Sequence, residues 1–187
     1  MTFSEEIIDY HKKKLLSFYD NILDNLKKND INKIKLLFSE LLNFLETISP
    51  DTIYKSPDIH LSFIYFLSAI FNIDRDLFEN IIKIGLKYFP DSVQLIEMNA
   101  KKLFLKNNFG KSLESWLQIE SAINEGNFYP YFNFSPKENM LNSLKGVALC
   151  YEKLGDIENM VLYNDKLNYY LIIQNLRFEV SKFLFKY

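Results

Sequence analysis

The stretch that decides the fold is Gly146–Ile157, which reads GVALCYEKLGDI. Its apolar helical face runs to Leu154, and the Gly155-Asp156 pair that follows predicts a tight turn. A second amphipathic segment begins at once and continues through Leu167. One such helix pair cannot bury its own apolar face, so it must stack on a neighbouring pair. This stretch therefore predicts an all-α fold built from antiparallel helix pairs.

Length and composition agree with a helical fold. A chain of 187 residues is long enough for a sizeable core, and the sequence predicts a single domain over residues 1–187. Only 5 glycines and 5 prolines interrupt it. An all-β fold needs many more such turn residues, so this scarcity favours long helices with few turns. No segment alternates apolar and polar residues with the period of a β-strand.

Charge and cysteine content bear on partners and location. The formal net charge is −2, so no global positive field attracts nucleic acid. The single cysteine, Cys150, cannot form an internal disulfide, which is typical of a reducing compartment. The N-terminus lacks the apolar core of a signal peptide, and the most apolar stretch, 59–73, is shorter than the roughly 20 residues that span a bilayer. We expect a cytoplasmic protein without nucleic-acid or membrane partners.

Helical spacing of the apolar residues divides the chain into helix pairs. The predicted pairs cover residues 4–49, 58–89, 93–124 and 136–170, and a final helix over 171–187 is expected to cap the stack. The first helix of the second pair, 58–71, is apolar on nearly all sides and should be strongly buried. Asp74 has the position of an N-cap for the helix that follows.

The register of large and small residues within these pairs resembles the tetratricopeptide repeat. With Gly155 at the turn, Tyr151 occupies the position of the family's conserved tyrosine, and Phe66 and Ala100 stand one 34-residue period apart (100 − 66). The chain departs from the pattern at Asn164, where the family has an aromatic residue. The resemblance implies a short α-solenoid that binds a protein or peptide on its concave surface, as a non-enzymatic scaffold or adaptor without a cofactor.

A second, narrower resemblance concerns residues 84–168. Gly85–Ser92 reads GLKYFPDS and Tyr151–Asp156 reads YEKLGD, and these segments are similar to the C-terminal repeat region of bacterial family-2 glycosyltransferases. The sequence lacks the nucleotide-sugar-binding α/β domain of those enzymes. This likeness implies an accessory module of a glycosyltransferase or peptide-modification system. A peptide-sensing regulator is the last alternative, although no basic helix-turn-helix segment accompanies the repeats.

The tetratricopeptide resemblance also implies which residues face a ligand, because the first helix of each pair lines the concave surface in that family. The register assigns this role to Tyr19, His60, Phe63, Gln94, Lys101, Asn142 and Lys145, and it also places Leu23, Lys27, Leu67, Glu97 and Glu152 there. Lys101, Asn142 and Lys145 could hold a peptide backbone or carboxylate by charge-assisted hydrogen bonds. The N-terminal part of this predicted surface is apolar. It could therefore pack against another helix of the chain or against a second subunit in a homodimer.

An aromatic insertion separates the last two pairs. Residues 128–134 read FYPYFNF, and its aromatic members are Phe128, Tyr129, Tyr131, Phe132 and Phe134. We favour the interpretation that the insertion folds back and fills the gap between repeats. The alternative is an exposed aromatic lip that contacts a peptide, a sugar or another subunit.

The sequence predicts no catalytic residue and no metal site. Asp74-Arg75-Asp76 has the Asp-x-Asp form of glycosyltransferase metal sites, but an N-cap with a first-turn carboxylate explains both aspartates. His11 and His60 lie far apart, and neither has a further ligand at metal-binding spacing, so a structural role is favoured for each. Cys150 lies on an apolar helix face without a neighbouring base, which favours a core position.

Overall fold

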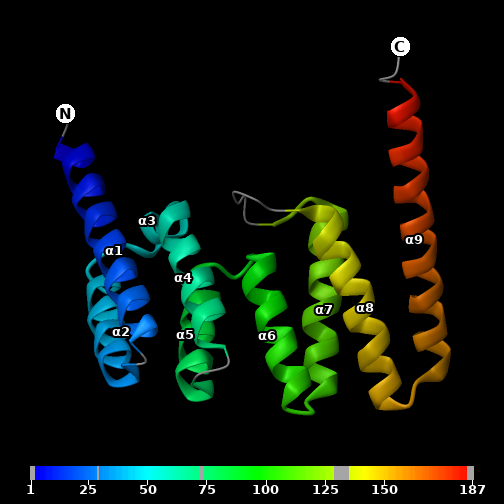
Figure 1. The fold of residues 1–187 in the computed structure, drawn as a ribbon, viewed down its shortest axis with the longest axis horizontal. Helices are drawn as coiled ribbons and strands as arrows, with labels where there is room; N and C mark the ends of the chain where they lie inside the picture. Colours follow the sequence, from blue (N-terminus) through cyan, green and yellow to red (C-terminus); the bar gives the residue numbers. More distant parts are fainter. Residues whose placement is uncertain (1–2, 29, 72–73, 129–134, 185–187) are drawn as a thin grey trace. The chain divides into compact units, whose positions relative to one another are not determined.

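The structure is a computed structural model that describes residues 3–28, 30–71, 74–128 and 135–184. Within these ranges every regular element is an α-helix, and the helices pack in neighbouring pairs, as the sequence predicts (Figure 1). They form two compact units, Met1–Pro90 and Asp91–Tyr187. None of the described helices contains a stretch long and apolar enough to cross a membrane.

The first unit contains two helix pairs and one short helix. Its elements are α1 (Phe3–Lys27), α2 (Ile31–Leu45), α3 (Pro50–Tyr54), α4 (Pro57–Ile70) and α5 (Arg75–Tyr88). Helix α1 packs against α2 and also contacts α4, which in turn packs against α5. Helix α3 lies in the connection between the two pairs and contacts both α4 and α5.

Aromatic side chains join the helices of the first unit. The ring of Phe38 on α2 meets that of Phe66 on α4 edge-on, with 6.5 Å between centroids. Phe89 follows α5 directly, is fully buried, and contacts rings from α3 and α4. Helix α4 has buried apolar residues from Ile59 to Ile70, as its sequence predicts.

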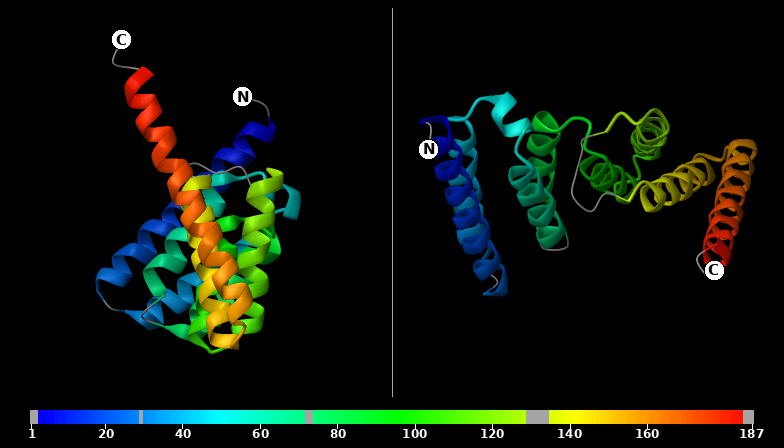
Figure 2. Two further views of the ribbon diagram at one scale, coloured as in Figure 1. Left: turned by 90° about the vertical axis from the view of Figure 1, so that its right-hand side faces the viewer. Right: turned by 90° about the horizontal axis from the view of Figure 1, so that it is seen from above.

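The second unit is a run of four helices in which each contacts the next along the chain (Figures 1 and 2). Its elements are α6 (Val93–Leu105), α7 (Phe109–Glu125), α8 (Pro136–Leu154) and α9 (Ile157–Leu184). Helix α6 also contacts α8, so the first helices of the two pairs lie side by side. This is the same relation that joins α1 to α4 in the first unit.

Buried hydroxyl groups connect α6, α7 and α8. The Ser112 hydroxyl donates to the carbonyl of Ala100 at 2.9 Å, and the Ser143 hydroxyl donates to that of Trp116 at 2.7 Å. The thiol of Cys150 lies 3.4 Å from the Ser112 hydroxyl. Each of these side chains therefore has a hydrogen-bond partner inside the core, which removes the cost of burying a polar group.

The turn that the sequence predicts at Gly155 is confirmed. Gly155 adopts φ = 76°, in the left-handed region that glycine enters without strain. The amide of Asp156 donates to the carbonyl of Tyr151, and the Asp156 carboxylate accepts from the amide of Asn159 at 3.1 Å. One dipeptide thus ends α8 and begins α9.

The C-terminal tail differs from its prediction. Residues 171–187 were expected to form a separate capping helix, but α9 runs without a break from Ile157 to Leu184. The reason is local, because no glycine or proline occurs in this range to end the helix.

Candidate functional site

A polar cluster joins α6 to α8 within the second unit. At its centre lies Glu97, which is only 8% exposed. Its carboxylate accepts from Lys101 Nζ at 2.6 Å, from Asn139 Nδ2 at 2.9 Å and from Asn142 Nδ2 at 3.1 Å. A carboxylate so far removed from water is stable only with such partners, so these four residues form one connected unit.

Helix geometry explains why the cluster forms here. Glu97 and Lys101 are four residues apart on α6, and Asn139 and Asn142 are three apart on α8, so each pair lies on a single helix face. Because α6 contacts α8, the two faces meet. Ser135 caps the start of α8 by accepting from the amide of Glu138 at 3.3 Å.

The cluster retains hydrogen-bonding capacity for a ligand. Lys101 is 52% exposed, and its hydrogen bond to Glu97 uses one of three ammonium donors. Asn142 is half-buried and donates once to Glu97, while its Oδ1 has no partner in the described ranges. A peptide group offers one donor and one acceptor. Among the described residues, the side-chain amide of Asn142 still has one N–H donor and its Oδ1 acceptor to pair with them.

Four of the residues that the sequence predicted as a binding surface belong to this region. Lys101 and Asn142 meet at Glu97, and Lys145 is exposed one turn beyond Asn142 on α8. Gln94 is half-buried, and its Oε1 is enclosed without a hydrogen-bond partner in the described part of the chain. The sequence did not predict Asn139 as a member of this surface. Its position three residues before Asn142, on the same helix face, could have indicated it.

Three other predicted members of that surface are wrong, and one of them, Leu67, is 0% exposed. His60 is 0% exposed and Phe63 is 2% exposed, so neither can line an open groove. The Phe89 ring covers them, with its centroid 4.9 Å from that of His60 and 6.2 Å from that of Phe63. The burial of His60 agrees with the structural role that the sequence favoured for it. Tyr19 belongs to α1, but its side chain lies outside the described residues.

The aromatic insertion is described only at its start. Phe128 is half-buried just after α7. Tyr129, Tyr131, Phe132 and Phe134 lie outside the described residues, so both interpretations of the insertion stay predictions.

The candidate reactive groups have structural positions. Cys150 is fully buried, and this burial raises the pKa of its thiol and disfavours the thiolate. The described residues contain no group of three or more His, Cys, Asp or Glu side chains that could hold a metal ion.

Asp74 is the N-cap of α5, as the sequence predicts. Its carboxylate accepts from the amide of Leu77 at 2.9 Å and forms an ion pair with Lys35 Nζ at 2.8 Å. The Leu77 amide, assisted by the Lys35 ammonium, lowers the pKa of Asp74 below its usual value. Asp76, the other carboxylate of the Asp-x-Asp sequence, is exposed in the first helical turn.

This assignment predicts the effect of replacing Asp74. Asp74→Ala should lower the free energy of unfolding by about 1 kcal/mol, whereas Asp74→Asn should lower it less because asparagine also caps helices. The carboxylate pKa is lower in the folded state, so its stabilising effect is present at neutral pH and is lost as acid protonates Asp74. The difference between wild type and Asp74→Asn should therefore disappear in acid urea titrations. Thermal stabilisation by Mg²⁺ or Mn²⁺ that Asp74→Asn abolishes would instead indicate a metal site.

The chain matches no protein-family model, and it has no significant match among the curated proteins or the solved structures.

Proposed function

We propose that this chain is a non-enzymatic, tetratricopeptide-like module that binds a protein or peptide through the face formed by α6 and α8, as a scaffold or adaptor. The observation that carries the proposal is the polar cluster of Glu97, Lys101, Asn139 and Asn142. The fold supports the proposal because α6 and α8, the first helices of consecutive pairs, lie side by side. These are the helices that line the ligand-binding surface in the family that the sequence resembles.

The cluster suits a peptide because its groups are held in place before a ligand arrives. Glu97 holds the side chains of Lys101 and Asn142 with one carboxylate oxygen, which limits the rotamer freedom that binding would otherwise remove. Asn142 can then pair with a backbone amide, while the ammonium groups of Lys101 and Lys145 can contact a carboxylate. A segment with an acidic side chain or a free C-terminus next to an exposed peptide group would satisfy all three residues.

The proposal predicts the behaviour of Lys101→Ala combined with Lys145→Ala. Peptides selected from a random display library on the whole chain should bind this double variant about tenfold more weakly, because two ammonium contacts are lost. Isothermal calorimetry measures the affinity. Asn142→Ala tests the backbone contact separately and should weaken the same peptides without a change in net charge.

The matched control replaces two exposed lysines elsewhere on the second unit, Lys111 of α7 and Lys137 of α8, with alanine. Its affinity should equal that of wild type, and circular dichroism should show that every variant is folded. Failure to select any peptide, or peptides that bind the Lys101/Lys145 variant as tightly as wild type, would contradict the proposal.

A further inference from the structure

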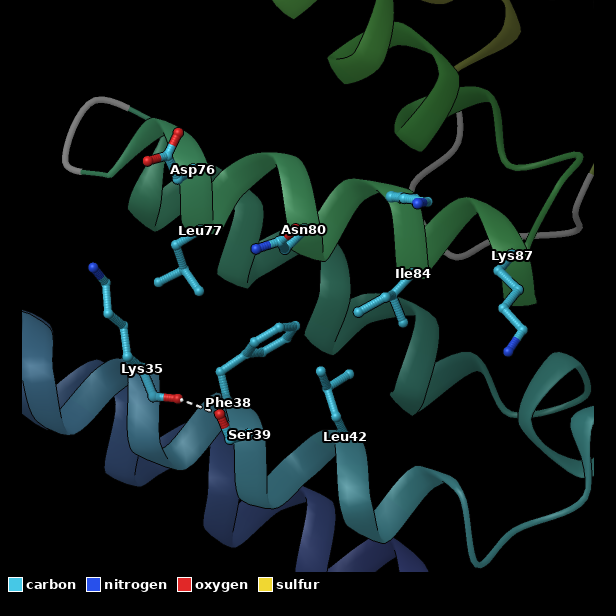
Figure 3. Close-up of a pocket in the computed structure, with 10 residues that line it drawn as sticks. Lys35, Phe38, Ser39, Leu42, Asp76, Leu77, Asn80, Ile84 and Lys87 are labelled. Carbon is cyan, nitrogen blue, oxygen red and sulfur yellow. Dashed lines mark hydrogen bonds between the residues drawn. The ribbon is translucent and has the colours of Figure 1, made fainter.

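A groove in the first unit has no role in the binding surface proposed above. It lies between α2 and α5 and encloses about 670 Å³. Phe38 and Leu42 of α2 face Leu77 and Ile84 of α5 across it and form an apolar floor (Figure 3). Helices α2 and α5 run in the same direction along the two sides, so the groove has the form of a channel between parallel helices (Figure 3).

The rim of the groove is positively charged at one end. Its lining includes Lys35, Lys83 and Lys87 but only one carboxylate, that of Asp76, which leaves a formal charge of +2. Lys35 and Asp76 lie at the same end of the groove (Figure 3). At this end Lys35 forms an ion pair with Asp74. The unbalanced charge therefore belongs to Lys83 and Lys87, near the C-terminal end of α5.

Lys83 and Lys87 have no carboxylate partner within the described ranges. Among the described residues no ion pair includes either lysine, and the Lys87 ammonium lies over the neighbouring Tyr88 ring, at 5.5 Å from its centroid. Both side chains are exposed, and their four-residue spacing places them one turn apart on one face of α5. Like charges at this spacing repel, so the binding of two negative groups beside the lysines would offset the repulsion between their ammonium groups.

We propose that this groove binds an acidic amphipathic helix of a partner protein. The apolar side chains of that helix cover Phe38, Leu42, Leu77 and Ile84. Its carboxylates, one turn apart, pair with Lys83 and Lys87. The proposal rests on the charge complementarity of the rim and on the absence of a carboxylate partner for these two lysines among the residues that the structure describes.

The dimensions of the groove favour a helix as its occupant. Along α5 the lining extends from Asp76 to Lys87, which corresponds to about 16 Å of helix. A partner helix that follows it for three turns presents apolar residues at i, i+3 or i+4, and i+7, which is the pattern of helix-in-groove recognition. Pairs of acidic residues at i and i+4 on the flank of that helix then lie at the same spacing as the two lysines.

The probe is a synthetic amphipathic helix of about 14 residues, which is slightly longer than the groove. Three leucines occupy one face, and two glutamates at i and i+4 occupy the flank. Titration of the isotope-labelled whole chain should move the backbone NMR signals of α2 and α5 most. Lys83→Glu combined with Lys87→Glu should weaken this binding at least about tenfold, since two attractions become two repulsions.

Three comparisons make the result specific. Lys83→Arg with Lys87→Arg should retain binding because the charge is kept, and Lys111→Glu with Lys137→Glu should bind as wild type because those lysines lie on the second unit. A probe with glutamine in place of glutamate should bind the whole chain more weakly. Because these residues are separate from Lys101 and Lys145, the alanine double variant of those two should bind this probe normally. The two proposed surfaces can therefore fail independently.

Several outcomes would overturn the proposal. The absence of binding, signal changes spread outside α2 and α5, or equal affinity of the charge-reversed variant would exclude an acidic helix as the occupant. Preferential binding to vesicles of anionic phospholipid that the Lys83/Lys87 variant loses would assign the lysines to a membrane surface. A concentration-dependent dimer in sedimentation that the same variant dissociates would assign the groove to a second copy of this chain.

Discussion

Replacement of Phe89 by alanine should lower the free energy of unfolding by about 3–5 kcal/mol, which is the cost of removing a fully buried aromatic side chain. Phe89 is 0% exposed, and its ring contacts the rings of Tyr54, His60 and Phe63. These neighbours belong to α3 and α4, whereas Phe89 follows α5. The substitution would therefore open a cavity where three helices meet, and the aromatic neighbours are too large to fill it by small movements.

Urea unfolding followed by circular dichroism measures this effect, because helicity reports on both units. Leu105→Ala is the control, since Leu105 is 66% exposed and its truncation should change stability by less than about 0.5 kcal/mol. The backbone amide of Phe89 donates to the carbonyl of Gly85 at 2.8 Å, and alanine keeps that bond. A stability loss for Phe89→Ala no greater than that for Leu105→Ala would show that the ring is not packed as the structure describes.

Phe89 also explains where prediction from sequence failed. Register alone placed His60 and Phe63 on an open surface, because it assumed that every first helix of a pair presents the same face. Helix α3 and the residue after α5 are not part of that register, yet they supply the rings of Tyr54 and Phe89 that lie against α4. Helix α4 does have an exposed side, which includes Tyr65 and Ser68, but it is not the side that the register assigned.

Features that depend on a few neighbouring residues could be predicted from the sequence. The turn at Gly155 and the cap at Asp74 each depend on residues close together in sequence, and both are confirmed. The register placed Lys101 and Asn142 on one surface, but it did not predict that both would bond to the Glu97 carboxylate. The groove between α2 and α5 could not be predicted, because the separation of those helices depends on how α1 packs on α4.

Substitution of Gly146 by alanine is the second change with a large expected effect. Gly146 is buried on α8 against Trp116 of α7. A Cβ atom at this position would lie closer than 3.0 Å to the Trp116 atoms Cε2, Cδ2 and Nε1. The indole is rigid and nearly fully buried, so relief requires α8 to move away from α7. Overpacking of this kind costs about 1–3 kcal/mol, and we expect the upper end of that range.

Gly110→Ala is a matched control with the opposite expected sign. The same chemical change occurs inside a helix, but a Cβ at Gly110 would have no neighbour within 4 Å. Alanine there should stabilise the chain by up to about 1 kcal/mol through helix propensity alone. Gly110 lies in the first turn of α7 and Gly146 in the interior of α8, so the propensity gain at Gly146 should be at least as large. The difference between the two variants is therefore a lower bound on the steric cost of the Trp116 contact.

Trp116 is the single tryptophan of the sequence, so its fluorescence reports the unfolding of the second unit directly. Gly146→Ala should lower the urea midpoint seen by this probe and shift the native emission to the red as water reaches the indole. In a Trp116→Leu background, helicity should show that Gly146→Ala costs at least about 1 kcal/mol less, because the group that it strikes is gone. Equal costs in both backgrounds would mean that Gly146 is required for some reason other than close approach to Trp116. A smaller cost of Gly146→Ala in the Trp116→Leu background would instead identify this glycine as the residue that allows α8 to pack against α7. That packing brings Asn139 and Asn142 to Glu97.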